Sequence, residues 1–164
     1  MYKRQVLYSD FECSFCRRQE EVLKKLLTLY PDRVRLVWKH FPLSRLGGGR
    51  AASETAECAR RQGRFWELHD LLLDGPVRRR ERDLEQAAQA AGVDLERLRA
   101  DLPGCRARVD AELAEGQGLG VESPPTLFVN GLRLVGMRPL PELRLLVEEE
   151  TAPGLLDQLT ADPP

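Results

Sequence analysis

The stretch Asp10-Phe11-Glu12-Cys13-Ser14-Phe15-Cys16 decides how this chain folds. It follows a short apolar run, Val6–Tyr8, which predicts a strand. From Ser14 onward, apolar residues recur at three- and four-residue spacing, which predicts a helix. The two cysteines therefore stand where a strand ends and a helix begins. A thiol at that position faces unpaired backbone N–H groups and the positive end of the helix dipole, and both favour the thiolate.

The spacing of the two cysteines predicts a redox pair. Cys16 follows Cys13 by one helical turn and can reach it to resolve a mixed disulfide. We expect Cys13 to be the exposed nucleophile and Cys16 the more buried resolving thiol. Half of a zinc site, two inert core thiols and a structural disulfide are the alternatives. Zinc needs four ligands, and the other cysteines and histidines stand apart: Cys58, Cys105, His40 and His69.

The residues that follow predict an α/β architecture. Pro31-Asp32 ends the first helix, and Val34–Trp38 predicts a second strand, parallel to the first because a helix joins them. The glycine run Gly47-Gly48-Gly49 predicts a flexible break before a long helical stretch. Its predicted helices are Ala51–Gln62, Phe65–Leu73, Asp83–Ala91, Leu95–Leu102 and a last helix separated off by Pro103-Gly104.

Strand character returns near the end of the chain. Thr126–Val129 and Leu132–Val135 flank Asn130-Gly131, which is a strong hairpin signal. Pro141–Glu150 predicts a closing helix with proline in its first turn. We therefore expect a discontinuous α/β domain formed by residues 1–45 and 119–164, with residues 46–118 as a helical insertion.

Composition narrows the class of function. The chain has 164 residues, a hydrophobic fraction of 42% and a formal net charge of -1. The charge gives no reason to expect a nucleic-acid partner or a membrane surface, and no apolar run is long enough to span a bilayer. The sequence shows no signal-peptide pattern, and we interpret Met1–Gln5 as a truncated end, so location is not decided by it.

Four motifs together resemble the DsbA-like branch of the thioredoxin superfamily. They occur in the same order along nearly the whole chain: Asp10–Cys16, His40-Phe41-Pro42-Leu43, Gly63-Arg64-Phe65-Trp66-Glu67-Leu68-His69 and Pro125-Thr126-Leu127-Phe128-Val129-Asn130-Gly131. The resemblance implies a thioredoxin-like fold with a helical insertion. It also implies Cys13 as nucleophile and Cys16 as resolving cysteine.

The resemblance implies roles for the residues around the pair. Ser14 and Phe15, between the cysteines, support the active site and tune its redox poise. Pro125 is implied to be cis and to pack against the disulfide. Its neighbours Pro124 and Thr126 are implied to contact an extended substrate backbone.

Three positions depart from the family pattern. Pro124 stands where the family more often has Thr or Val, and because proline lacks an N–H, one backbone hydrogen bond to substrate is lost. Leu7 stands where many relatives carry a buried acid, which leaves Glu12 or a water to exchange a proton with Cys16. Ser14 replaces the proline commonly found after the first cysteine, which leaves the direction of the reaction open.

The remaining cysteines allow two interpretations. Cys58 and Cys105 lie in the first and last helices of the insertion, as two small buried residues or as a structural disulfide that clamps it. A disulfide would indicate an oxidising compartment. His40 and His69 are expected to be structural residues.

These observations lead to a functional hypothesis. We expect a thiol–disulfide oxidoreductase that acts on cysteine-containing polypeptides as a dithiol oxidase, because the resemblance is to oxidising relatives. No cofactor, metal or nucleotide is expected. The protein is expected to be a monomer outside the cytoplasm, in the periplasm or cell envelope, and the family implies a membrane redox partner. The alternatives are a reductase or isomerase of the same fold, and a non-catalytic zinc-binding or structural module.

Overall fold

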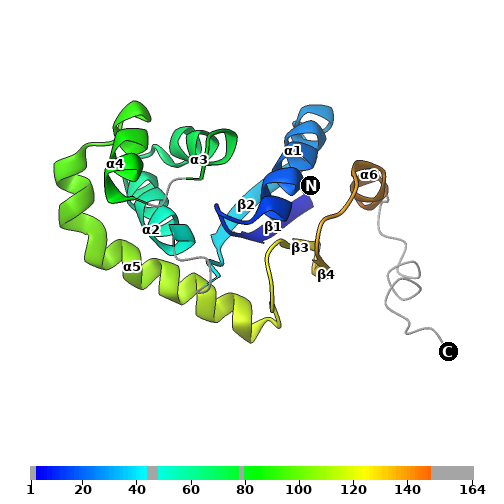
Figure 1. Cartoon of the computed structure of the whole chain (residues 1–164). Helices are drawn as coiled ribbons and strands as arrows, with labels where there is room; N and C mark the ends of the chain where they lie inside the picture. Colours follow the sequence, from blue (N-terminus) through cyan, green and yellow to red (C-terminus); the bar gives the residue numbers. More distant parts are fainter. Residues whose placement is uncertain (1–2, 44–47, 78–79, 149–164) are drawn as a thin grey trace.

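The computed structural model describes residues 3–43, 48–77 and 80–148, and Figure 1 shows their path. The elements follow in the order β1 (Lys3–Ser9), α1 (Ser14–Leu29), β2 (Val34–His40), α2 (Gly48–Arg61), α3 (Phe65–Asp74), α4 (Glu81–Ala90), α5 (Leu95–Gly118), β3 (Thr126–Val129), β4 (Leu132–Val135) and α6 (Leu140–Glu148). The predicted α/β fold with a helical segment between its second and third strands is confirmed. The expected domain boundary at residues 45 and 46 lies outside the described residues.

The four strands form one mixed sheet in the order β2-β1-β3-β4. β1 pairs in parallel with β2, as the strand–helix–strand pattern predicts, and in antiparallel fashion with β3. The register places Ser9 beside His40, and Tyr8 beside Thr126. The loop that carries Cys13 therefore leaves β1 at the same end of the sheet at which the Pro125 loop enters β3.

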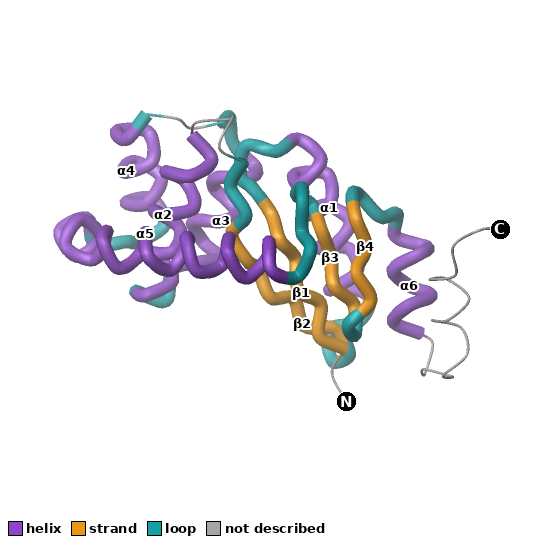
Figure 2. Tube along the Cα trace, turned by 90° about the horizontal axis from the view of Figure 1, so that it is seen from below, coloured by secondary structure: helices purple, strands orange, loops and turns teal. Residues whose placement is uncertain are grey.

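Side chains alternate between the two faces of the sheet. Leu7 and Leu127 face a large apolar core that includes residues of α1 and α6. Tyr8 and Phe128 face the opposite side, where they pack against a smaller cluster. Figure 2 shows α1 and α6 on one face and the C-terminal part of α5 across the other. The active-site helix is thus anchored on the main core.

The hairpin follows its sequence signal. Asn130 and Gly131 have positive φ values of 50° and 92°, as a type I′ turn requires. β3 and β4 begin and end at the predicted residues.

Two predictions about the helical segment are wrong. Pro103 does not divide a helix, because α5 continues through it. Proline removes one backbone hydrogen bond there, but Cys105 and Val109 in the next two turns are fully buried, and their packing stabilises the continuous helix. Gly48 and Gly49 open α2 and do not form a flexible break. A Cβ on Gly49 would lie 2.3 Å from Oδ1 of Asp10, so only glycine allows this approach.

Candidate active site

Cys13 is the N-cap residue of α1. Its backbone is extended, and its Sγ accepts a hydrogen bond from the backbone N–H of Cys16 at 3.4 Å. The backbone N–H of Cys13 donates to Asp10 O at 3.2 Å, which closes the turn after β1. No acidic side chain occupies the first turn of α1. The positive end of the helix therefore acts on the Cys13 sulfur with no carboxylate of that turn to offset it.

The two thiols have opposite electrostatic surroundings. The expectation that Cys13 is exposed is wrong: it keeps only 8% of its surface accessible and is buried, and Cys16 is fully buried. The Cys16 thiol and the backbone N–H groups of Cys16 and Phe15 hydrogen-bond to the Cys13 sulfur, and against the opposing effect of burial they lower the pKa of Cys13 to about 6. Burial, followed by the neighbouring Cys13 sulfur, raises the pKa of Cys16 well above its ordinary value. The Cys13 thiol therefore ionises readily, whereas the Cys16 thiol retains its proton.

The loop before β3 closes over Cys13. The Pro124–Pro125 peptide bond is cis, and the Cys13 thiol donates to Pro124 O across 3.7 Å. Pro124, Pro125 and Thr126 are all buried. The Thr126 hydroxyl donates to Ser123 O at 2.7 Å, so this side chain stabilises the loop that precedes β3. These three residues are therefore shielded from solvent.

Asp10 is a site residue that the sequence reasoning did not single out. Its side chain is fully buried and accepts backbone hydrogen bonds from Glu12 and Leu43, each at 2.9 Å. Burial raises the pKa of Asp10, and the two backbone donors partly offset this. The Asp10 charge in turn raises the pKa of Cys13. The available signal was its place at the strand end, three residues before the first cysteine.

The two residues between the cysteines point outward. Ser14 is exposed, and Phe15 keeps 54% of its surface accessible. The guanidinium of Arg18 lies 4.9 Å from the centre of the Phe15 ring. An aromatic ring and a cation therefore stand beside Cys13 on the first turns of α1.

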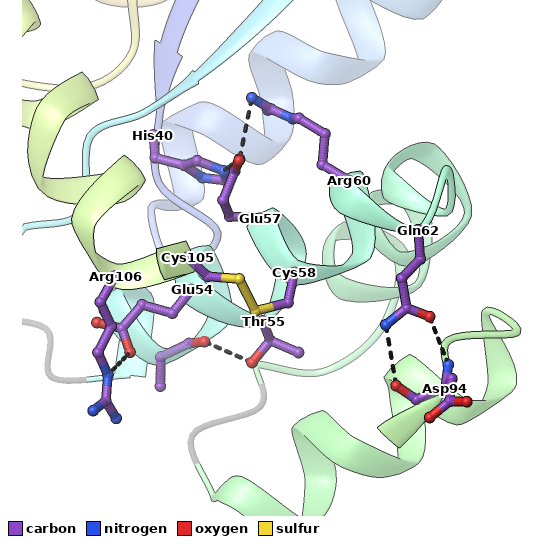
Figure 3. The surroundings of a disulfide bond; sticks show 11 residues. His40, Glu54, Thr55, Glu57, Cys58, Arg60, Gln62, Asp94, Cys105 and Arg106 are labelled. Atoms are coloured by element: carbon purple, nitrogen blue, oxygen red, sulfur yellow. Dashed lines mark hydrogen bonds and ion pairs between the residues drawn. A yellow bond between two sulfur atoms is a disulfide. The ribbon is translucent and has the colours of Figure 1, made fainter. Parts of the chain in front are cut away.

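The other two cysteines are joined in a disulfide. Cys58 in α2 and Cys105 in α5 have Cα atoms 5.5 Å apart, and both are fully buried. Figure 3 shows ion pairs around this bond. Arg106 bonds to Glu54 at 3.1 Å, and further along α2 Arg60 pairs with Glu57 at 3.2 Å. The disulfide and the Arg106–Glu54 pair join the first and last helices of the helical segment, whereas the Arg60–Glu57 pair lies within α2.

His40 and His69 belong to an aromatic cluster behind the active-site loop. Phe11 stacks on Trp38 with ring centres 5.0 Å apart, and the His69 ring lies edge-on to Trp38 at 4.6 Å. Burial lowers the pKa of His40, which favours its neutral form. Neither histidine stands beside the cysteines as a ligand. Among the residues described in the structure, no three His, Cys, Asp or Glu side chains gather in a set that could hold a metal ion.

A family model described as thioredoxin matches residues 3–149 of the chain. The chain belongs to this family. A thioredoxin-like oxidoreductase from Silicibacter pomeroyi DSS-3 superposes with a TM-score of 0.80 and 27% identity, covering 89% of this chain and 84% of the other. The thiol-disulfide exchange protein alpha-DsbA2 from Wolbachia pipientis gives 0.77 and 15% identity, covering 96% and 82%. The protein therefore has the fold of the thiol–disulfide oxidoreductases.

Curated relatives extend well beyond the matched region. The Na(+)/H(+) antiporter NhaA 1 of Salinispora arenicola is 42% identical over 131 residues, which are 78% of this chain and 20% of that protein. The chain thus spans about a fifth of the length of the curated relatives it matches. Of the helices that the structure describes, none has the length and apolar character needed to cross a bilayer.

Proposed function

We propose that the protein catalyses dithiol–disulfide exchange with polypeptide substrates through Cys13 and Cys16, in the direction of substrate oxidation. One observation carries the proposal: two adjacent thiols share one helix N-terminus and have pKa values displaced in opposite directions. Perturbation of this kind is typical of functional sites.

The proposed reaction balances without a cofactor. A substrate thiolate attacks Cys13 Sγ of the oxidised protein, the Cys13–Cys16 bond breaks, and Cys16 leaves and takes up a proton. A second substrate thiolate then attacks the substrate sulfur of the mixed disulfide and releases the Cys13 thiolate. Two electrons pass from the substrate dithiol to the protein. The leaving group is Cys13, whose low pKa makes this second step favourable.

The lowered pKa of Cys13 supports its proposed role as the thiol that exchanges with substrate. A stabilised thiolate stabilises the reduced protein and makes its disulfide the stronger oxidant. The pKa of the first cysteine is about 7 in thioredoxin and about 3.5 in DsbA, and in both proteins, as at Cys13, it lies below that of an ordinary thiol. The buried Cys58–Cys105 disulfide supports a location in an oxidising compartment, outside the cytoplasm.

Trapping of the mixed disulfide tests the proposal. The Cys16→Ser variant cannot resolve, so with a peptide disulfide it should accumulate a covalent adduct of protein and peptide that mass spectrometry detects. Cys13→Ser should form no adduct under the same conditions. Equal amounts of adduct on both variants would mean that Cys13 is not the nucleophile. The absence of an adduct on both variants would refute the proposed exchange.

A further inference from the structure

Two adjacent arginines on α1 have different environments. The Arg17 guanidinium donates to three backbone oxygens at the end of α3, those of Leu73 at 2.6 Å, Gly75 at 2.7 Å and Leu72 at 3.1 Å. Arg17 therefore joins the active-site helix to the helical segment. Arg18 is exposed, and within residues 3–43, 48–77 and 80–148 it has no ion pair with a carboxylate. Its guanidinium rests on the Phe15 ring.

The Phe15–Arg18 pair is placed to meet a substrate. Phe15 directly precedes Cys16 and lies two residues after the thiol that the substrate would attack. Its 54% exposure is unusual for a ring of this size next to a buried cysteine. A chain segment bonded to Cys13 would pass within reach of this pair.

An exposed apolar side chain lies in the loop after β4, which is tied to both the Pro125 loop and α1. Met137 is 42% exposed in the loop after β4. That loop is tied to the Pro125 loop by Gly136 N–H, which donates to Pro125 O at 2.9 Å, and to α1 by Arg138 N–H, which donates to Gln19 Oε1 at 2.6 Å. The Arg138 guanidinium donates hydrogen bonds to Val135 O and to the Glu142 carboxylate. Met137 therefore offers apolar surface, and Arg18 offers the unpaired charge.

The double proline increases the importance of these side chains. Pro124 has no N–H to donate, so a substrate strand beside it loses one backbone hydrogen bond. Backbone bonds carry no sequence information, whereas side-chain contacts do. Selectivity at this site must therefore come from the groups that flank Cys13.

We propose that the Phe15–Arg18 pair selects substrate segments that carry an acidic residue next to the reacting cysteine. This inference rests on the proposed exchange reaction and names its substrate class. A carboxylate would pair with Arg18, whose charge is uncompensated, while the Phe15 ring would hold the guanidinium in place. A basic residue at the same position would be repelled.

The test compares two reduced dithiol peptides that differ only at the residue beside the first cysteine, Glu in one and Lys in the other. Rates of reduction of the oxidised protein are each divided by the peptide's rate with an uncharged disulfide, that of 2-mercaptoethanol, which removes the effect of the flanking charge on the peptide thiol. We expect the normalised Glu-to-Lys ratio to be about threefold at low salt and to approach one in high salt, as for an exposed ion pair.

Two charge reversals make the test specific. Arg18→Glu should invert the ratio, whereas Arg35→Glu, an equal charge change on β2 at the end of the sheet opposite the Cys13 loop, should leave it unchanged. An unchanged ratio in Arg18→Glu would overturn the inference while leaving the exchange reaction intact. No exchange with either peptide would instead refute the proposed function. A dimer in sedimentation that Phe15→Ala dissociates would also overturn the inference, because the pair would then cover a second copy of the chain.

Discussion

Cys13–Cys16 and Cys58–Cys105 are both buried cysteine pairs carried by helices, yet they differ in their position along the helix and in the hydrogen bonds that their sulfur atoms can accept. Cys13 caps α1 and faces its backbone N–H groups, whereas Cys58 and Cys105 lie inside α2 and α5, where the backbone N–H groups are already used. The first pair is present as free thiols and the second as a disulfide. The difference lies in the backbone: a cysteine at a helix N-terminus meets free N–H groups that stabilise a thiolate, whereas a cysteine in the helix interior does not.

Removal of the nucleophile should produce the largest difference between the two pairs. Cys13→Ser should reduce peptide oxidation to the rate without protein, because a hydroxyl at this position is not ionised and cannot form the mixed disulfide. The matched control is the double variant Cys58→Ala/Cys105→Ala, which should retain the exchange rate at a temperature where it is folded. Equal losses in both variants would remove the distinction between the pairs.

Removal of the structural disulfide should act on stability. The bond closes a loop between residues separated by 47 positions. For a loop of this length, the chain-entropy model gives a stabilisation of about 4 kcal/mol. Urea unfolding of the double variant should show a loss of this order in the free energy of unfolding. Cys13→Ser/Cys16→Ser is the control at pH 5, where the Cys13 thiol is protonated and adds no thiolate stabilisation. It should unfold close to wild-type protein in which only the Cys13–Cys16 pair is reduced, and a larger loss there would contradict the assignment.

The pH dependence should separate the two thiols within the active pair. With its pKa lowered to about 6, Cys13 should react with iodoacetamide at a rate that rises through pH 6 and levels off by about pH 8, whereas an ordinary cysteine has a pKa of about 8.5. Cys16, with its raised pKa, should remain unmodified in the folded protein.

The same displacement of the Cys13 pKa affects stability. The folded reduced protein holds Cys13 as thiolate at lower pH than the unfolded chain does. Its contribution to stability is complete above the ordinary thiol pKa and is lost as the pH falls through about 6. The oxidised protein lacks this thiolate, so urea unfolding at pH 5 and pH 8 should show the extra pH dependence in the reduced form alone. Identical pH dependence in both forms would exclude a depressed pKa.

Asp10 should give the smallest effect. Asp10→Asn removes the charge that raises the pKa of Cys13, so that pKa should fall further, as measured by thiolate absorbance at about 240 nm. An amide can accept at only one of its two ends, so one backbone donor loses its partner at a cost of about 1–3 kcal/mol. Asp32→Asn, on the exposed turn after α1, is the control and should change neither quantity. A raised Cys13 pKa in Asp10→Asn would contradict the assigned direction.

The sequence predicts the elements that depend on local patterns. Apolar alternation and the Asn130-Gly131 turn locate the strands, and the strand end before Cys13 locates the candidate site. It does not predict features that depend on tertiary contact. Gly49 is predicted to lie in a break between helices because Asp10, which requires a glycine there, is distant in the sequence. Pro103 is predicted to end a helix because the burial of Cys105 cannot be recognised from the neighbouring residues alone. The burial of Asp10 is hidden for the same reason.

Equilibration in glutathione buffers, followed by thiol trapping and mass analysis of both pairs in the same sample, tests the central claim most directly. The account predicts that Cys13–Cys16 titrates reversibly, at a potential between about -270 and -120 mV, while Cys58–Cys105 stays oxidised throughout because structural disulfides lie below about -300 mV. A Cys13–Cys16 pair that never forms a reversible disulfide, or two pairs that titrate together, would contradict the division of this chain into one reactive and one structural pair.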